Sequence, residues 1–211
     1  SENHIAYLTC GEKHCVAITV DDEVYTWGQY EAARTSTIPI PVKVNNYVTM
    51  ASCGEGFTIL GNSRSLWISQ TSPEALKDSQ IIEKPLHIPK GDSIYSIDTV
   101  GPVSVITTQS GQILLYSGET LIHSLQPSDT LYDQVHLTKD RIIVRNSNKK
   151  LFSTTYEVPD SKPYKLEPFK PIPLPEGFAS ANQYSVGVNH SIAIHFSEPA
   201  TSITEMPAEF E

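Results

Sequence analysis

Histidines and cysteines are the side chains of this sequence with the clearest potential for chemistry. His14 and His190 could serve as general bases or metal ligands. Cys10 and Cys15 are separated by four residues, a spacing that some metal sites use, but no second Cys/His pair follows at a usual zinc spacing. The sequence also lacks a Gly-rich phosphate loop, a nucleophile elbow and a paired-histidine metal motif. We therefore expect no catalytic residue, no metal and no cofactor, and hence no enzyme.

The histidines instead mark an internal repeat. Residues 9–19 align without gaps with residues 185–195, so that Gly11 matches Gly187 and His14 matches His190. A catalytic histidine need not recur in a repeat, whereas a packing residue should. We interpret both histidines as structural, each bonded to the backbone of a neighbouring repeat. Cys10 and its repeat equivalent Cys53 are interpreted in the same way, as small residues packed near the axis of the fold.

Weaker copies of the repeat lie between these two segments. The anchor positions of all five copies are residues 11, 54, 101, 138 and 187. The unit therefore recurs about every 44 residues, a period typical of propeller blades and repeat arrays. The anchor glycines are expected to allow close backbone approach or a positive φ; they are Gly11, Gly54, Gly101 and Gly187.

The segments after the anchors have the pattern of β-hairpins. In each of the first four units a polar turn precedes an apolar pair, as in Asp21-Asp22-Glu23 before Val24-Tyr25. Prolines gather in the connectors between units. Because proline has no backbone N–H to donate, these connectors should run along an edge of a sheet or outside it. No segment combines apolar residues at helical spacing with capping signals. An all-β fold with several strands in each unit follows, and the long period favours a β-propeller.

The best-preserved unit resembles the repeat of the regulator of chromosome condensation (RCC) family. That repeat has a Cys-Gly-x-x-His-x-x-Ala core and a later Trp-Gly, which here are Cys10 to Ala17 and Trp27-Gly28. The resemblance implies a propeller of about four to five RCC-like blades. The expected units are residues 5–47, 48–93, 94–131, 132–177 and 178–196, and residues 197–211 form an acidic linker or disordered tail.

Family propellers usually have seven blades, so the count in this chain is low. Three alternatives stay open: further blades in a longer parent protein, blades supplied by a partner, or an unusually small ring. An open array would expose the edges of its sheets, which proteins normally cover.

The charge balance restricts the class of partner. The chain has 15 Lys+Arg and 24 Asp+Glu, a net charge of −9, which argues against non-specific binding to nucleic acid or an anionic membrane. No apolar run is long enough to span a bilayer, and the first residues do not resemble a secretory signal. An odd number of cysteines without framework spacing favours a reducing compartment, so we expect an intracellular protein of the cytoplasm or nucleus.

Charged groups in the first and fourth units are the candidate partner-binding residues. The hairpin tip Asp21-Asp22-Glu23 would meet a basic partner, or it is simply a solvated turn. The fourth unit is locally basic and would contact an acidic protein or a nucleic-acid backbone, or it forms a solvated edge strand; its candidate residues are Arg141, Arg145, Lys149 and Lys150.

These observations lead to a primary functional hypothesis and two alternatives. The primary one is a non-catalytic protein–protein interaction scaffold that uses a propeller face and belongs to a larger protein or complex. The resemblance implies the first alternative, a guanine-nucleotide exchange factor for a Ran-like small GTPase. The second is chromatin or nucleic-acid binding through the basic fourth unit, which the net charge disfavours. The expected partner is a protein, either a small GTPase or a subunit that completes the propeller.

Overall fold

The computed structural model consists of antiparallel sheets that follow one another along the chain. It describes residues 4–31, 34–42, 44, 46–70, 82–125, 130–156, 166–173, 183–186 and 191–194. Within these ranges there are strands and turns but no helix. In this described part of the chain, four sheets have four strands each, and the last sheet has two. The all-β class expected from the sequence is confirmed.

Every four-stranded sheet is a meander in which strands adjacent in sequence pair with one another. The first sheet contains β1 (Ile5–Cys10), β2 (His14–Thr19), β3 (Val24–Glu31) and β4 (Arg34–Val42). The second contains β5 (Met50–Cys53), β6 (Phe57–Gly61), β7 (Leu66–Gln70) and β8 (Ile82–Leu86).

The later sheets repeat this order. The third contains β9 (Ile94–Val100), β10 (Val103–Thr108), β11 (Ile113–Ser117) and β12 (Thr120–Leu125). The fourth contains β13 (Tyr132–Leu137), β14 (Arg141–Asn146), β15 (Leu151–Thr155) and β16 (Lys170–Pro171). The two-stranded sheet pairs β17 (Gln183–Val186) with β18 (Ser191–Ile194).

Polar turn residues connect the second and third strands of the sheets. Asp22 and Lys149 adopt φ values of 63° and 60° in these turns, and Gly111 adopts 86°. Asp, Asn and Gly tolerate this left-handed backbone at low cost, whereas the lysine is held there by its neighbours. In the turn that contains Lys149, Asn146 Oδ1 accepts a 2.8 Å hydrogen bond from the Lys150 amide. Side chains of the turn thus support the tight hairpins that the sequence predicts.

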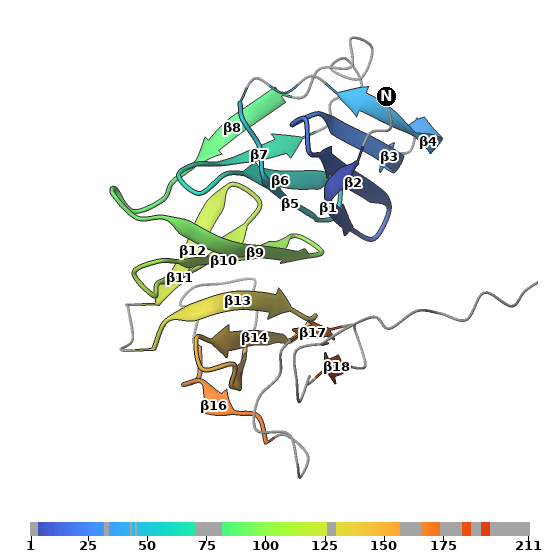
Figure 1. Ribbon diagram of the computed structural model, residues 1–211. Helices are drawn as coiled ribbons and strands as arrows, with labels where there is room; N and C mark the ends of the chain where they lie inside the picture. The colour runs from blue at the N-terminus through green and yellow to red at the C-terminus, as the bar shows by residue number, and fades with distance from the viewer. Residues whose placement is uncertain are drawn as a thin grey trace, which may run out of the picture.

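The sheets are stacked side by side with their first strands innermost. β1 contacts β5, β5 contacts β9, and β9 contacts β13, while β17 touches β13. Figure 1 shows the sheets succeeding one another along an arc from the blue N-terminal sheet to β17 and β18. Radially arranged four-stranded meanders with their first strands toward a common axis are the blades of a β-propeller.

The hydrophobic core is divided into three clusters, one between each pair of neighbouring four-stranded sheets. Because successive side chains of a strand point to opposite faces, a sheet between two others is apolar on both. In β10, Val105 belongs to the cluster shared with the fourth sheet and Ile106 to the cluster shared with the second. Both side chains are fully buried. Burial between blades is therefore the main stabilising interaction of this fold.

His14 forms a polar contact between the first two blades. Its side chain is 2% exposed, and its Nε2 lies 2.8 Å from Thr58 Oγ1 on β6. This partner is a side-chain hydroxyl group of the neighbouring blade. Burial lowers the pKa of His14 to about 4, because the imidazolium would lose its hydration.

Close approach of the same two blades requires a glycine at position 11. A Cβ atom on Gly11 would lie 2.8 Å from both the Cβ and the carbonyl oxygen of Cys53. Gly28 has a φ of +111°, and a Cβ there would lie 2.4 Å from the Lys13 carbonyl oxygen. These contacts explain why glycine stands at both positions of the repeat.

The buried imidazole predicts a stability that falls at mildly acidic pH. Below about pH 6.5 the unfolded chain binds a proton at His14 that the folded chain does not accept until about pH 4, so lowering the pH through this window favours unfolding. The slope should approach about 1.4 kcal/mol per pH unit. Urea unfolding of the wild type and of His14→Gln at several pH values measures it. The variant should lack this part of the slope, and the exposed-residue control His4→Gln should retain it.

Candidate interaction faces and axial groove

The meander gives each blade two ends with different connections. At one end of every blade lie the turn between its second and third strands and the segment that connects it to the first strand of the next blade. We call this end of the propeller the connector face. Backbone hydrogen bonds join these parts across blades, as from Ile94 N to Ser63 O at 2.8 Å. Within a blade, the Ser147 amide donates to the Leu131 carbonyl at 3.2 Å. The opposite end, which holds the turns between first and second strands, is the hairpin face.

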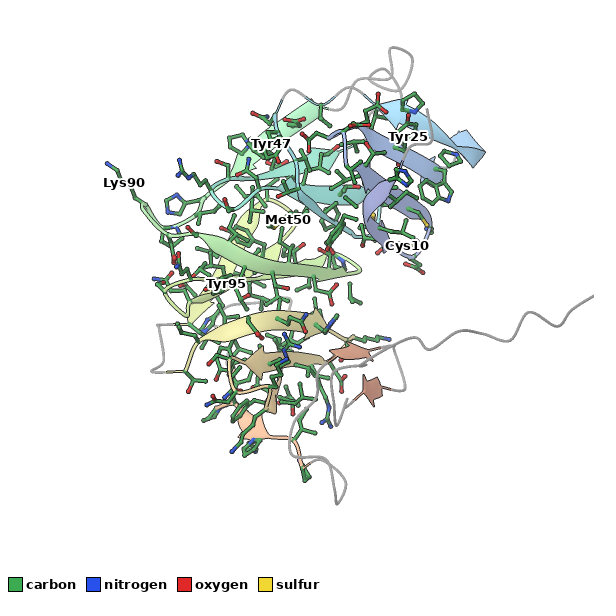
Figure 2. All side chains as sticks on the ribbon, viewed as in Figure 1. Cys10, Tyr25, Tyr47, Met50, Lys90 and Tyr95 are labelled. Atoms are coloured by element: carbon green, nitrogen blue, oxygen red, sulfur yellow. The ribbon has the colours of Figure 1, made fainter. Side chains whose placement is uncertain are left out.

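Exposed large apolar side chains gather on the connector face. Among the described residues this group comprises Ile5, Val20, Tyr47, Tyr95 and Leu131, each at a strand end or connector on that face and each at least 43% exposed. Figure 2 labels Tyr47 and Tyr95. The hairpin face holds Leu121 from the same set, and Leu8 lies within β1. Single exposed apolar residues are ordinary, but their concentration on one face is typical of an interaction surface.

The charged turns predicted from the sequence also lie on the connector face. Asp21, Asp22 and Glu23 are exposed at the tip of the first blade, where the Tyr25 hydroxyl donates a 3.0 Å hydrogen bond to Glu23 Oε2. Lys149 and Lys150 are exposed at the corresponding tip of the fourth blade. The face therefore carries an acidic group on one blade and a basic group on another.

The structure divides the four basic residues that the sequence analysis grouped together. Arg141 begins β14 at the hairpin face, whereas Lys149 and Lys150 follow the end of that strand at the connector face. A strand of this length is on the order of 20 Å long. Arg141 is exposed and has only a distant ion pair with Asp140, at 3.9 Å. These cations consequently do not form one surface.

Arg145 is an internal structural residue. Its side chain is 10% exposed, and its guanidinium binds the Asp133 carboxylate through two parallel contacts, Nε to Oδ1 and Nη2 to Oδ2, each of 3.0 Å. This bidentate geometry gives strong, directional hydrogen bonds. Because Asp133 lies on the innermost strand, the pair holds β13 against β14, and the Arg145 guanidinium is engaged within the blade.

The innermost strands enclose a groove along the propeller axis. Its volume is about 590 Å³, and its lining comes from β1, β5, β9 and β13, including Tyr7, Met50, Ser96 and Asp98. Asp98 accepts hydrogen bonds from the amides of Thr99 at 2.9 Å and Leu137 at 2.7 Å, and His136 Nδ1 lies 3.4 Å from it. The groove is thus polar, and one of its carboxylates, that of Asp98, joins the third and fourth blades.

Sequence reasoning missed Asp98, Asp133 and His136. The available signal was weak: Ser96 and Asp98 alternate with apolar residues in β9, which places polar side chains on one side of that strand. Nothing in the local sequence indicates that this side meets the backbone of β13, some 39 residues later.

The predicted repeat residues that the structure describes have different surroundings. Trp27 is half-buried on β3. A Cβ on Gly54 would lie 2.8 Å from Thr99 of the next blade, and Gly101 has a φ of +58° in the turn after β9. Gly187 and His190 lie outside the described residues, as does the segment 197–211.

The described ranges contain neither a cluster of metal-ligating side chains nor a helix able to span a membrane. There, no group of three or more His, Cys, Asp or Glu side chains is arranged to hold a metal ion. The same part of the chain contains no helix with the length and apolar character needed to cross a membrane.

Comparison with known proteins identifies the fold but no family. No family model matches the chain, and no curated protein matches its sequence. Human WBSCR16 is similar in structure, with 12% identity and a TM-score of 0.68, over 93% of this chain and 59% of that protein. The β-propeller domain of Cps50 (Swd1) from Myceliophteria thermophila has 13% identity and a TM-score of 0.61, over 84% and 61% of the two chains.

A third similar structure connects the fold with the resemblance seen in the sequence. Prp20p from Saccharomyces cerevisiae, the yeast RCC1, has 15% identity and a TM-score of 0.54, over 74% of this chain and 46% of that one. At such identities the similarity establishes the fold alone. The β-propeller is confirmed, and membership of the RCC repeat family is not established by this match. The chain spans less than two thirds of each of these proteins.

A pair of matched substitutions separates the internal arginine from the exposed lysines. Arg145→Met should lower the free energy of unfolding by about 2 kcal/mol or more, because it leaves the partly buried Asp133 without its counterion. Lys150→Met, at an exposed turn, should change it by no more than about 0.5 kcal/mol. Denaturant titration of both variants measures the difference. Equal stabilities would show that the Arg145–Asp133 pair does not hold the fourth blade.

Proposed function

We propose that this chain is a non-catalytic interaction scaffold that binds a protein partner through the connector face of its propeller. The observation that carries the proposal is the concentration of exposed apolar side chains on that face, between acidic and basic turns. Interfaces combine apolar anchors with a polar, charged rim, and tyrosine is enriched among the residues that dominate binding energy. The hairpin face has charged turns and a single large exposed apolar residue in the described ranges.

Similar propellers support a protein partner as the ligand class. Prp20p is described with its binding to Gsp1p and histones, and yeast RCC1 is described bound to Kap60. The net charge of −9 favours encounter with a basic protein surface. An intracellular location, in the cytoplasm or nucleus, is part of the same proposal.

A completing subunit or further blades form a second part of the proposal. The described residues supply two strands to the last sheet where the other sheets have four, and the similar proteins are longer than this chain. Completion of that sheet would satisfy the backbone groups at its edges, which are otherwise open to pairing. Further blades would come from a longer parent protein or from a partner subunit.

Guanine-nucleotide exchange is the second candidate function. The likeness to Prp20p, which binds Gsp1p, is the observation that favours it. Displacement of a nucleotide by an inserted loop needs no catalytic side chains, so the absence of a catalytic motif does not distinguish exchange from simple binding. Nucleic-acid binding has no comparable support, because the basic residues of the fourth blade point to different faces.

Substitutions on the two faces test the scaffold. The double variant Tyr47→Asp, Tyr95→Asp places charges on the connector face, and Leu121→Asp places one on the hairpin face as a matched control. Proteins captured by the tagged chain from its own cells are to be purified and titrated against each variant by calorimetry. The double variant should bind at least about tenfold more weakly, which corresponds to about 1.4 kcal/mol, and the control should bind like the wild type.

The same purified chains distinguish the alternatives. If Leu121→Asp weakens binding and the double variant does not, the partner uses the hairpin face and the proposed face is wrong. Faster release of labelled GDP from a Ran-like GTPase in the presence of the chain would establish exchange. A scaffold leaves that release rate unchanged.

A further inference from the structure

Cys10 and Cys15 face each other across the first hairpin. Cys10 is the last residue of β1, Cys15 is the second residue of β2, and the two are direct partners in the antiparallel register. The turn between them is closed by a 2.8 Å hydrogen bond from the Gly11 amide to the His14 carbonyl. Hydrogen-bonded and non-hydrogen-bonded pairs alternate along an antiparallel ladder, so the adjacent Cys10–Cys15 pair is of the non-hydrogen-bonded kind.

This kind of pair has the geometry that a disulfide needs. Its Cα atoms are about 4.5 Å apart and its side chains lie closer than in the hydrogen-bonded kind. A disulfide requires Cα separations of about 4.4–6.8 Å. The two side chains project from the same face of the sheet as direct cross-strand neighbours. Joining them therefore requires little movement of the backbone.

The three cysteines of the chain differ in their access to solvent. Cys10 is exposed and lines the axial groove, Cys15 is half-buried, and Cys53 is buried. Burial, followed by the contact with Cys10, raises the pKa of Cys15 to about 11. Burial raises the pKa of Cys53 to about 12, and its Sγ lies 3.9 Å from the Thr9 carbonyl oxygen. Cys10 is consequently the thiol that a dissolved oxidant reaches first.

We propose that Cys10 and Cys15 form a reversible dithiol–disulfide site whose oxidant is a small disulfide of the glutathione type. The Cys10 thiolate attacks one sulfur of the oxidant, forming a mixed disulfide and releasing one thiolate. The Cys15 sulfur then attacks Cys10 Sγ, which breaks the mixed bond and releases the second thiol. The protein loses two hydrogen atoms, and the oxidant is reduced to two thiols.

The site is independent of the proposed scaffold function, because it lies at the hairpin-face end of β1. Oxidation would covalently join β1 to β2 in the blade at the beginning of the array. Cys15 is paired with Trp27 of β3, so both side chains occupy the same face of that sheet. Trp27 therefore provides an optical signal close to the sulfur atoms.

The test is oxidation of the reduced full chain in buffers that contain increasing proportions of oxidised glutathione. Trypsin cleaves after Lys13, between the two cysteines, so an internal disulfide joins two tryptic peptides that are separate after reduction. We expect this linked pair in the monomer, with the loss of two titratable thiols. In a Trp67→Phe background the fluorescence of Trp27 should fall on oxidation, since disulfides quench nearby indoles.

Single variants assign the roles of the three thiols. Cys15→Ser should leave Cys10 as a stable mixed disulfide with glutathione, Cys10→Ser should abolish oxidation, and Cys53→Ala should form the linked peptides as the wild type does. The proposal is overturned if Cys53 enters the linkage, if disulfides form only between chains, or if three titratable thiols persist in fully oxidised glutathione. Far-ultraviolet circular dichroism confirms that each variant is folded.

Discussion

The inner sheets of this protein are apolar on both faces, and each face is buried only by a neighbouring sheet. Val105 and Ile106 are adjacent in β10 yet belong to different core clusters, which lie on opposite sides of the third blade. A single blade could bury neither side chain by itself. Stability thus comes from contacts between neighbours, and the arc of blades in Figure 1 is a direct consequence of that requirement.

Stacking brings polar groups of different blades together, and these groups must be satisfied by one another. The His14 imidazole forms a hydrogen bond with the Thr58 hydroxyl, and the Asp98 carboxylate accepts a hydrogen bond from the Leu137 amide. The Arg145–Asp133 pair has the same role within the fourth blade. An unpaired polar group at such positions would cost free energy comparable to a lost hydrogen bond. His14, Asp98 and the Arg145–Asp133 pair are therefore components of the packing.

Most strand side chains are buried between blades, so the turns and connectors are the parts of the chain that can contact other molecules. The connector face carries Tyr47 and Tyr95 without any role for them in the clusters between blades. The first blade shows the same division on a smaller scale. Val16 and Ile18 pack toward the second blade, whereas Cys15 points to the opposite face of β2. The proposed binding surface and the dithiol site both occupy positions that stacking does not use.

The sequence by itself determined the features that depend on neighbours along the chain. Polar turn residues at Asp22 and Lys149 and alternating apolar residues predicted the hairpins, and the recurrence of Gly11 and His14 indicated a repeat with a structural histidine. Tertiary structure alone decided which residues meet across longer separations. The sequence grouped Arg145 with the exposed cations, but strand alternation and pairing turn it toward Asp133, while Arg141 and Lys150 end on opposite faces. Turn and strand preferences are local, whereas partners and faces are set by the register and stacking of whole sheets.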